Sequence, residues 1–186
     1  MTWQAELDEL ARRETLAMRR ELFGDEHPAI AIGLTNLASA LGRSGRLEEG
    51  QVMLRQSADL LRRLVGEEHP AWASVTASLA TFTHDQGDHG AAAALLRRSL
   101  AVRRSKLPPQ HPMTAITMID LGRCLTELGR FGEAEDLLLQ GLQEFDAMGE
   151  PQADRREATL ERLVTLYESW GKPGLAEEYA GLIPGG

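Results

Sequence analysis

The chain has 186 residues, 42% of them hydrophobic and 26% charged, which fits one globular domain and argues against disorder. Its 28 acidic residues outnumber its 20 basic ones, and the net charge of −8 disfavours nucleic acid, which proteins bind chiefly through its phosphates. The single cysteine excludes an internal disulfide, and the longest apolar run, from Ala91 to Leu96, is too short to span a membrane. We therefore expect a cytoplasmic protein with no signal peptide and no membrane or nucleic-acid partner.

Apolar residues recur at helical spacing along the chain, and no stretch alternates long enough to predict a strand. The first predicted helix covers residues 5–23 and stands alone. Its Leu16 is matched by Leu100, 84 residues later. Four helix pairs follow, over residues 28–65, 70–107, 112–148 and 154–183, so the sequence predicts nine helices in a single domain.

The four pairs share a spacing of 42 residues. A leucine lies eight residues before each repeated glycine, and a small residue lies five residues after it. The repeated glycines are Gly45, Gly87, Gly129 and Gly171. Glycine suits the left-handed position that ends a helix, so each should close the first helix of its pair. The dipeptides at His27, His69 and His111 place a proline at the start of that helix, where its missing N–H costs nothing.

Small residues recur where the two helices of a pair should cross. Ala38 and Gly122 on first helices, with Ala92 and Ala134 on second helices, would let the backbones approach closely. One pair cannot bury both its apolar faces, so neighbouring pairs must stack and share a core. Cys124 lies on the predicted buried side and is expected to be a small core residue.

These residues resemble the tetratricopeptide repeat family. Its L-G-x-x-Y … G-x-x-x-x-A pattern is readable from Leu121 through Gly129 to Ala134. The 42-residue period, with the His-Pro openings and Asn36-Leu37-Ala38, is similar to the longer, kinesin-light-chain-like variety. The resemblance implies an all-α, right-handed α-solenoid, an interaction scaffold whose concave wall is made by the first helices. It also implies a protein or peptide partner rather than catalysis.

The last helices, RLVTLYESWGKPGLAEEY, are also similar to C-terminal tails of large bacterial signalling proteins, including membrane-linked Ser/Thr kinases. No kinase motif is present in the chain. We therefore expect the module to be the C-terminal part of a larger bacterial signalling protein.

The family's groove positions predict a set of polar side chains on one face of successive first helices. A side-chain amide such as that of Asn36 can both donate to and accept from the backbone of an extended ligand. The alternative is that this face is polar because it is turned to water. The predicted groove residues are Asn36, Ser39, Arg43, Ser78, Thr81, Asp85, Asp120, Arg123, Glu127 and Arg162.

Other reactive residues favour structural interpretations. The HDxxDH segment from His84 to His89 carries metal-ligating residue types, but it straddles a turn, so its side chains should not converge. Arg20, Arg62 and Arg104 repeat every 42 residues near helix ends, where the helix dipole favours basic residues. No activated nucleophile or phosphate-binding loop is present. We expect no enzyme activity, no catalytic residue, no metal and no cofactor.

Self-assembly is the alternative function. The lone first helix lacks the partner that each later second helix has. It should leave an apolar edge, with Leu7, Leu10 and Leu16 available for stacking against another molecule.

Overall fold

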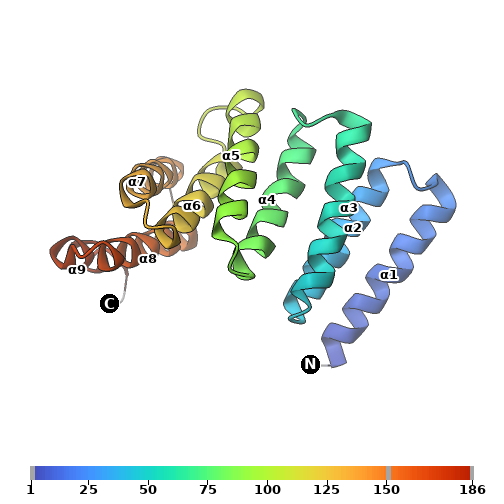
Figure 1. Cartoon of the computed structure of the whole chain (residues 1–186), viewed down its shortest axis with the longest axis horizontal. Coiled ribbons are helices and arrows are strands. Elements are labelled where there is room, and N and C mark those ends of the chain that lie inside the picture. Colours follow the sequence, from blue (N-terminus) through green and yellow to red (C-terminus); the bar gives the residue numbers. More distant parts are fainter. Residues whose placement is uncertain (1–2, 150–151, 185–186) are drawn as a thin grey trace. The chain divides into compact units, whose positions relative to one another are not determined.

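The computed structural model describes residues 3–149 and 152–184, which form nine α-helices and no strand (Figure 1). The helices are α1 (Trp3–Phe23), α2 (Pro28–Arg43), α3 (Leu47–Val65), α4 (Pro70–Asp85), α5 (His89–Lys106), α6 (Pro112–Glu127), α7 (Phe131–Met148), α8 (Ala153–Ser169) and α9 (Pro173–Ala180). The prediction of an all-α fold is confirmed. None of the described helices is long and apolar enough to cross a membrane.

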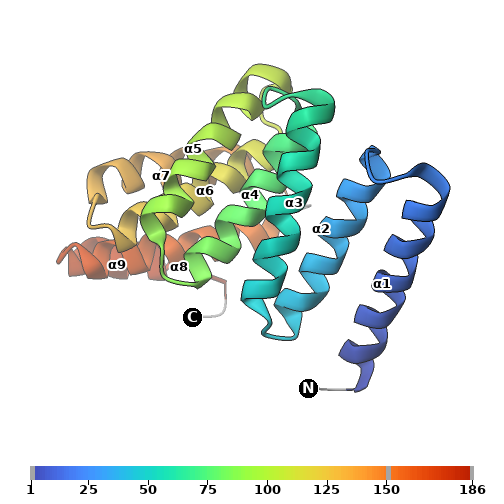
Figure 2. The same ribbon diagram turned by 45° about the vertical axis from the view of Figure 1, so that its right-hand side comes forward.

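Two compact units divide the chain between Asp88 and His89. The first unit holds α1–α4 and the second holds α5–α9, and within each unit successive helices pack side by side (Figures 1 and 2). In the second unit α6 also contacts α8. The boundary falls inside the predicted pair 70–107, and the assignment of four repeats to a single domain stays a prediction.

Each repeated histidine caps the helix that follows it. His27, His69 and His111 have extended backbones, and each Nδ1 accepts a hydrogen bond from the amide two residues later, at 3.1 Å. The proline at the first helical position has no N–H to satisfy, and the imidazole takes up one of the remaining free donors. The histidines therefore have a structural role at the starts of α2, α4 and α6.

The repeated glycines end the helices as predicted. Gly45, Gly87, Gly129 and Gly171 have φ values between 69° and 87°. After α6, for example, the Arg130 amide donates to the carbonyl of Leu125 at 2.9 Å, which is the longer hydrogen bond of a Schellman turn. This closure turns the chain back sharply, so the second helix of each hairpin begins within two residues of the glycine.

Small residues let the paired helices approach, as the spacing predicted. Ala38, Ala92 and Ala134 are fully buried. A Cβ on Gly122 of α6 would lie 2.8 Å from the Cγ of Leu138 on α7, so only glycine fits there without movement. Cys124 is buried, as expected for a core residue.

Leu16 and the last helix differ from the sequence predictions. Leu16 is 4% exposed because its side chain packs against α2 beside Gly33, so it does not belong to an apolar edge. Helix α9 ends at Ala180, earlier than predicted. It is held by the Tyr167 ring of α8, which stacks on Tyr179 at a centroid distance of 5.3 Å.

Candidate protein-interaction surfaces

An ion pair joins two predicted groove residues in the second unit. The Arg162 guanidinium of α8 donates to a carboxylate oxygen of Asp120 on α6 at 3.1 Å. The two positions are 42 residues apart, so the pair connects equivalent turns of two first helices. The Arg162 side chain is 31% exposed and that of Asp120 21%. Both therefore keep surface with which to contact another molecule.

This pair lies at the edge of a pocket between α6 and α8. The α6–α8 pocket has a volume of about 250 Å³ and combines apolar residues with two arginines and one carboxylate. Its lining residues are Ile116, Ile119, Asp120, Phe145, Arg155, Ala158, Thr159 and Arg162. Phe145 is buried and Ile116 is half-buried, so the apolar part of the lining can accept an aliphatic or aromatic side chain.

A buried arginine of α5 also contacts α6. Arg103 of α5 is 2% exposed and donates to the carbonyl oxygen of Met113 at 2.7 Å and to the hydroxyl of Thr117. Burial lowers the pKa of Arg103, and the nearby Asp120 carboxylate opposes that shift. Asp120 therefore interacts with two arginines, one buried and one partly exposed.

The other predicted residues of the second unit also lie on α6. Arg123 is half-buried and Glu127 is exposed near the end of the helix. Neither lines the α6–α8 pocket. They extend the polar surface of α6 one and two turns beyond Asp120, since helical positions three or four residues apart share a face.

In the first unit, α2 presents Asn36 and Ser39 to solvent, while Ser78 and Thr81 on α4 are half-buried. Ser39, Ser78 and Thr81 donate to carbonyls of their own helices at 3.1–3.3 Å, so their hydroxyl oxygens remain as acceptors. These four residues form the polar faces of the two first helices in this unit.

Arg43 and Asp85 have different surroundings. Arg43 forms an ion pair with Asp8 of α1. Asp85 is exposed and lines an open pocket of about 810 Å³ with the turn between α2 and α3. Both side chains therefore lie near the turn ends of their helices. Arg43 is one turn beyond Ser39 on α2, and its guanidinium is engaged by α1.

Sequence reasoning missed part of the α6–α8 pocket. Ile116 and Arg155 belong to it, but only Asp120 and Arg162 were predicted. The signal was available, because Ile116 and Ala158 are also 42 residues apart and lie one turn before the ion pair on the two helices.

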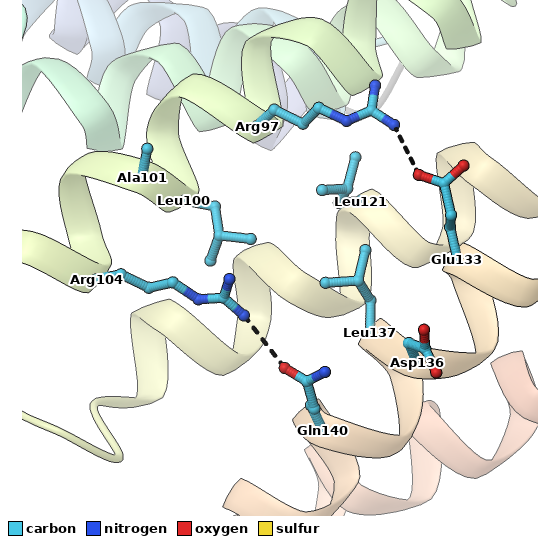
Figure 3. Close-up of a pocket in the computed structure, with 9 residues that line it drawn as sticks. All are labelled: Arg97, Leu100, Ala101, Arg104, Leu121, Glu133, Asp136, Leu137 and Gln140. Carbon is cyan, nitrogen blue, oxygen red and sulfur yellow. Dashed lines mark hydrogen bonds and ion pairs between the residues drawn. The ribbon is translucent and has the colours of Figure 1, made fainter.

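A second pocket in the same unit lies between α5 and α7, with no predicted groove residue in it (Figure 3). The α5–α7 pocket has a volume of about 420 Å³. Its lining residues are Arg97, Leu100, Ala101, Arg104, Leu121, Glu133, Asp136, Leu137 and Gln140. Figure 3 shows Arg97 and Arg104 reaching across towards α7, at the two ends of a leucine-lined centre.

No group of three or more histidine, cysteine, aspartate or glutamate side chains is placed to hold a metal ion within residues 3–149 and 152–184. This includes the segment from His84 to His89, whose residue types are suited to metal ligation.

Two family models match the chain, and both are described as tetratricopeptide repeat. One matches residues 30–105 and 72–143, and the other matches residues 13–29. No curated protein matches the sequence.

Solved structures share the fold at low sequence identity. A putative kinesin light chain from Podosopora anserina, described as having nearly identical TPR-like repeats, superposes with a TM-score of 0.82 at 22% identity, covering 97% of this chain and 85% of that one. BtubC (BKLC) from P. vanneervenii gives a TM-score of 0.86 at 17% identity, covering 97% of this chain and 72% of that one. The fold is therefore an all-α solenoid of a kind found in protein-interaction modules.

Proposed function

The chain belongs to the tetratricopeptide repeat family. From this premise we propose that the first helices of each unit bind an extended segment of another protein, on α2 and α4 in the first unit and on α6 and α8 in the second. The observation that carries this proposal is the Asp120–Arg162 pair at the edge of the α6–α8 pocket. It combines partly exposed charges of both signs with an apolar cavity.

The pocket has the chemistry to hold one residue of a peptide and the backbone beside it. An aliphatic or aromatic side chain would contact Ile116 and Ala158, which are half-buried, above the buried Phe145 ring. The Asp120 carboxylate can accept a peptide N–H, and the Arg162 guanidinium can donate to a peptide carbonyl. Arg155, also on the lining, favours an acidic group in the ligand. The charged groups should set the register of the peptide more than its affinity.

In the first unit the proposal assigns a similar role to the polar residues of α2 and α4. The exposed Asn36 amide can form two hydrogen bonds to an extended backbone. The hydroxyls of Ser39, Ser78 and Thr81 supply acceptors.

Selection of binders from a random peptide library on the intact chain tests this proposal. A selected peptide should bind the Arg162→Glu variant at least about tenfold more weakly. This charge reversal places a second carboxylate beside Asp120 and removes the guanidinium that would donate to the peptide. Arg98→Glu changes the net charge equally on α5, outside both pockets described above, and is the matched control. Equal binding by wild type and Arg162→Glu would contradict the proposal.

Asn36→Ala and Arg123→Glu test the wider polar surface. Arg123→Glu is expected to weaken binding of the peptide held by the second unit, and Asn36→Ala binding of a peptide held by the first. Neither should change helicity by circular dichroism or the melting temperature. If both variants bind normally, the groove assignment on α2 and α6 is wrong.

Self-association through α1 is the second candidate, and exposed apolar residues on α1 favour it. Trp3 is 71% exposed, Leu7 48% and Leu10 53%. These positions lie at helical spacing on one face, so a second copy could cover them together. Light scattering tests this candidate: Leu10→Lys should lower the mass of an assembly, and a monomeric wild type would contradict it.

The location and context of the module stay predictions from the sequence. They are a cytoplasmic location and a place in a larger bacterial signalling protein. The proposal requires neither, because the α6–α8 pocket is formed by the second unit alone.

A further inference from the structure

A similar pocket lies in each unit, formed mainly by helices other than those proposed to bind the peptide. The α5–α7 pocket has a counterpart of about 340 Å³ between α1 and α3, with Leu37 of α2 in its lining. Seven residues line the α1–α3 pocket: Arg13, Leu16, Ala17, Arg20, Leu37, Met53 and Gln56. The residue 84 positions after each of them lines the α5–α7 pocket. Six of these seven pairs are identical, and the seventh is Met53 with Leu137.

Packing accounts for only part of this identity. Leu16 and its equivalent Leu100 are buried and belong to the cores of their units. Arg20 and its equivalent Arg104 are exposed, and so are Gln56 and Gln140. Core packing does not dictate the identity of an exposed side chain, so these repeated polar residues call for another explanation.

The sequence 42 residues after the first set lacks this combination. Arg62 keeps the place of Arg20 and Arg104. However, Ala58 takes the place of Leu16, and Asp59 takes the place of Ala17. Arg98 takes the place of Gln56. Arg55 and Leu79 also keep the places of Arg13 and Leu37, so these residue types are general features of the repeat. The leucine, alanine and glutamine are combined with them in the two sets that line the described pockets, and not in the set that lies between those two in the sequence.

The geometry of the α5–α7 pocket indicates its chemistry (Figure 3). Arg97 and Arg104 lie two helical turns apart on α5, about 10 Å, with Leu100 between them. The Arg104 guanidinium donates to the side-chain oxygen of Gln140 and approaches the Met118 sulfur, both at 3.2 Å. Both hydrogen-bond acceptors are uncharged. The Glu144 carboxylate also interacts electrostatically with Arg104 but forms no hydrogen bond with it, so the guanidinium keeps N–H donors for a ligand carboxylate.

Arg97 and Arg20 are held only weakly, whereas Arg13 forms an ion pair with Glu9 of its own helix at 2.8 Å. A guanidinium nitrogen of Arg97 lies 3.6 Å from a Glu133 carboxylate oxygen, and both side chains are exposed. In the α1–α3 pocket Arg20 pairs with Asp25 at 3.3 Å, and the Asp25 side chain is 83% exposed. Exposed pairs of this kind contribute at most about 1 kcal/mol, so a ligand carboxylate can replace them.

We propose that each of these two pockets binds an acidic amphipathic helix of a partner protein. One aliphatic side chain of the partner packs on the accessible apolar lining above Leu16 or Leu100, which is Ala17 and Met53 in one pocket and Ala101 and Leu137 in the other. A carboxylate about one turn away binds the arginine at the equivalent position, Arg20 or Arg104. The chain then has an interaction surface distinct from the α6–α8 pocket, and it occurs once in each unit.

A designed helical peptide tests the proposal on the intact chain. The probe is a capped peptide of alanine and glutamine with one central leucine and two glutamates, placed four residues before and three residues after the leucine. Its control replaces both glutamates by glutamine. The readout is the methyl NMR signals of Leu16 and Leu100 during titration. The acidic probe should shift both signals, and the control should bind at least about tenfold more weakly.

Variants separate the two pockets. Arg104→Glu should weaken binding at Leu100 at least about tenfold and leave Leu16 unchanged, and Arg20→Glu should do the reverse. Arg62→Glu is the matched control, because it removes the same charge where the full set is absent, and it should leave both signals unchanged. Circular dichroism confirms that each variant is folded.

Three results would overturn the proposal. One is an absence of shifts at Leu16 and Leu100. Another is an equal loss for Arg62→Glu, which would indicate general charge attraction. The third is an equal response to a single-stranded oligonucleotide of similar length, which would indicate a phosphate ligand. If Ile116 shifts instead, the probe binds at the α6–α8 pocket, which would support the proposed function but not this inference.

Discussion

Gly122 of α6 provides a direct test of how the hairpins are packed. An alanine Cβ at this position would lie 2.8 Å from the Cγ and 2.9 Å from the Cδ2 of Leu138, which is fully buried. The Cγ is close to the backbone, so the clash cannot be relieved by moving only the tip of the side chain. Gly132 in the first turn of α7 is the matched control, because it is exposed and a Cβ there would meet no atom within 4 Å.

Two effects of opposite sign decide the outcome. Replacing a helical glycine by alanine stabilises by about 1 kcal/mol, and by less near a helix end. Overpacking a filled core costs about 1–3 kcal/mol. Gly132→Ala should therefore raise the free energy of unfolding slightly. Gly122→Ala should lower it by up to about 2 kcal/mol, so that the two variants differ by roughly 1–3 kcal/mol.

Thermal unfolding followed by circular dichroism measures this difference. For a chain of this size 1 kcal/mol corresponds to about 2–4 °C in melting temperature. Both glycines lie in the second unit, so the same transition reports both variants. In a Leu138→Ala background Gly122→Ala should become stabilising, because its Cβ then has space. The packing argument is refuted if Gly122→Ala stabilises the wild-type chain as much as Gly132→Ala does.

Substitutions at three further positions test the caps and the charges by denaturation. His111→Ala should cost about 1 kcal/mol, since it removes the acceptor of the Met113 amide, and His111→Asn should restore most of the loss. The hydrogen bond from Arg13 lowers the pKa of Glu9, so the stability that Glu9 adds exists above the ordinary value of 4.5 and is lost as pH falls through the lower, folded-state pKa. Glu9→Gln should remove that dependence. Burial raises the pKa of Glu144, whose Oε2 has no hydrogen-bond partner. Ionised Glu144 therefore lowers the free energy of unfolding, and this loss develops as pH rises through the folded-state pKa. Glu144→Gln should stabilise the chain above that pH, and an unchanged pH profile of stability would contradict this assignment.

The helical architecture was predictable because its determinants are local and repeated. A glycine every 42 residues closes each hairpin, and a proline opens the next. Small residues such as Ala38 and Ala134 mark the crossings of the helices. The histidines were correctly placed in the turns before the helices, but their side-chain caps depend on the extended backbone of His27 and its equivalents, which the spacing alone does not define.

The interaction surfaces were predictable only in part, because they depend on contacts between distant segments. The 42-residue register identified Asp120 and Arg162, which the structure brings together. The 42-residue spacing could not predict the ion pair between Asp8 of α1 and Arg43, because these two residues are not at equivalent positions of the repeat. Arg104 was assigned to a helix end by its local charge pattern, and that pattern does not reveal the leucines and Gln140 beside it.

Mapping of a bound peptide by NMR tests the central claim most directly. The peptide is one selected from a random library on the intact chain, and the observed signals are the methyl groups of Ile116 and Ile119 and the side-chain resonances of Arg162. We predict that these signals, from α6 and α8, shift during the titration and that Arg162→Glu abolishes the shifts. Shifts restricted to α5 and α7, with Ile116 and Ile119 unchanged, would contradict the claim that the first helices form the principal binding surface.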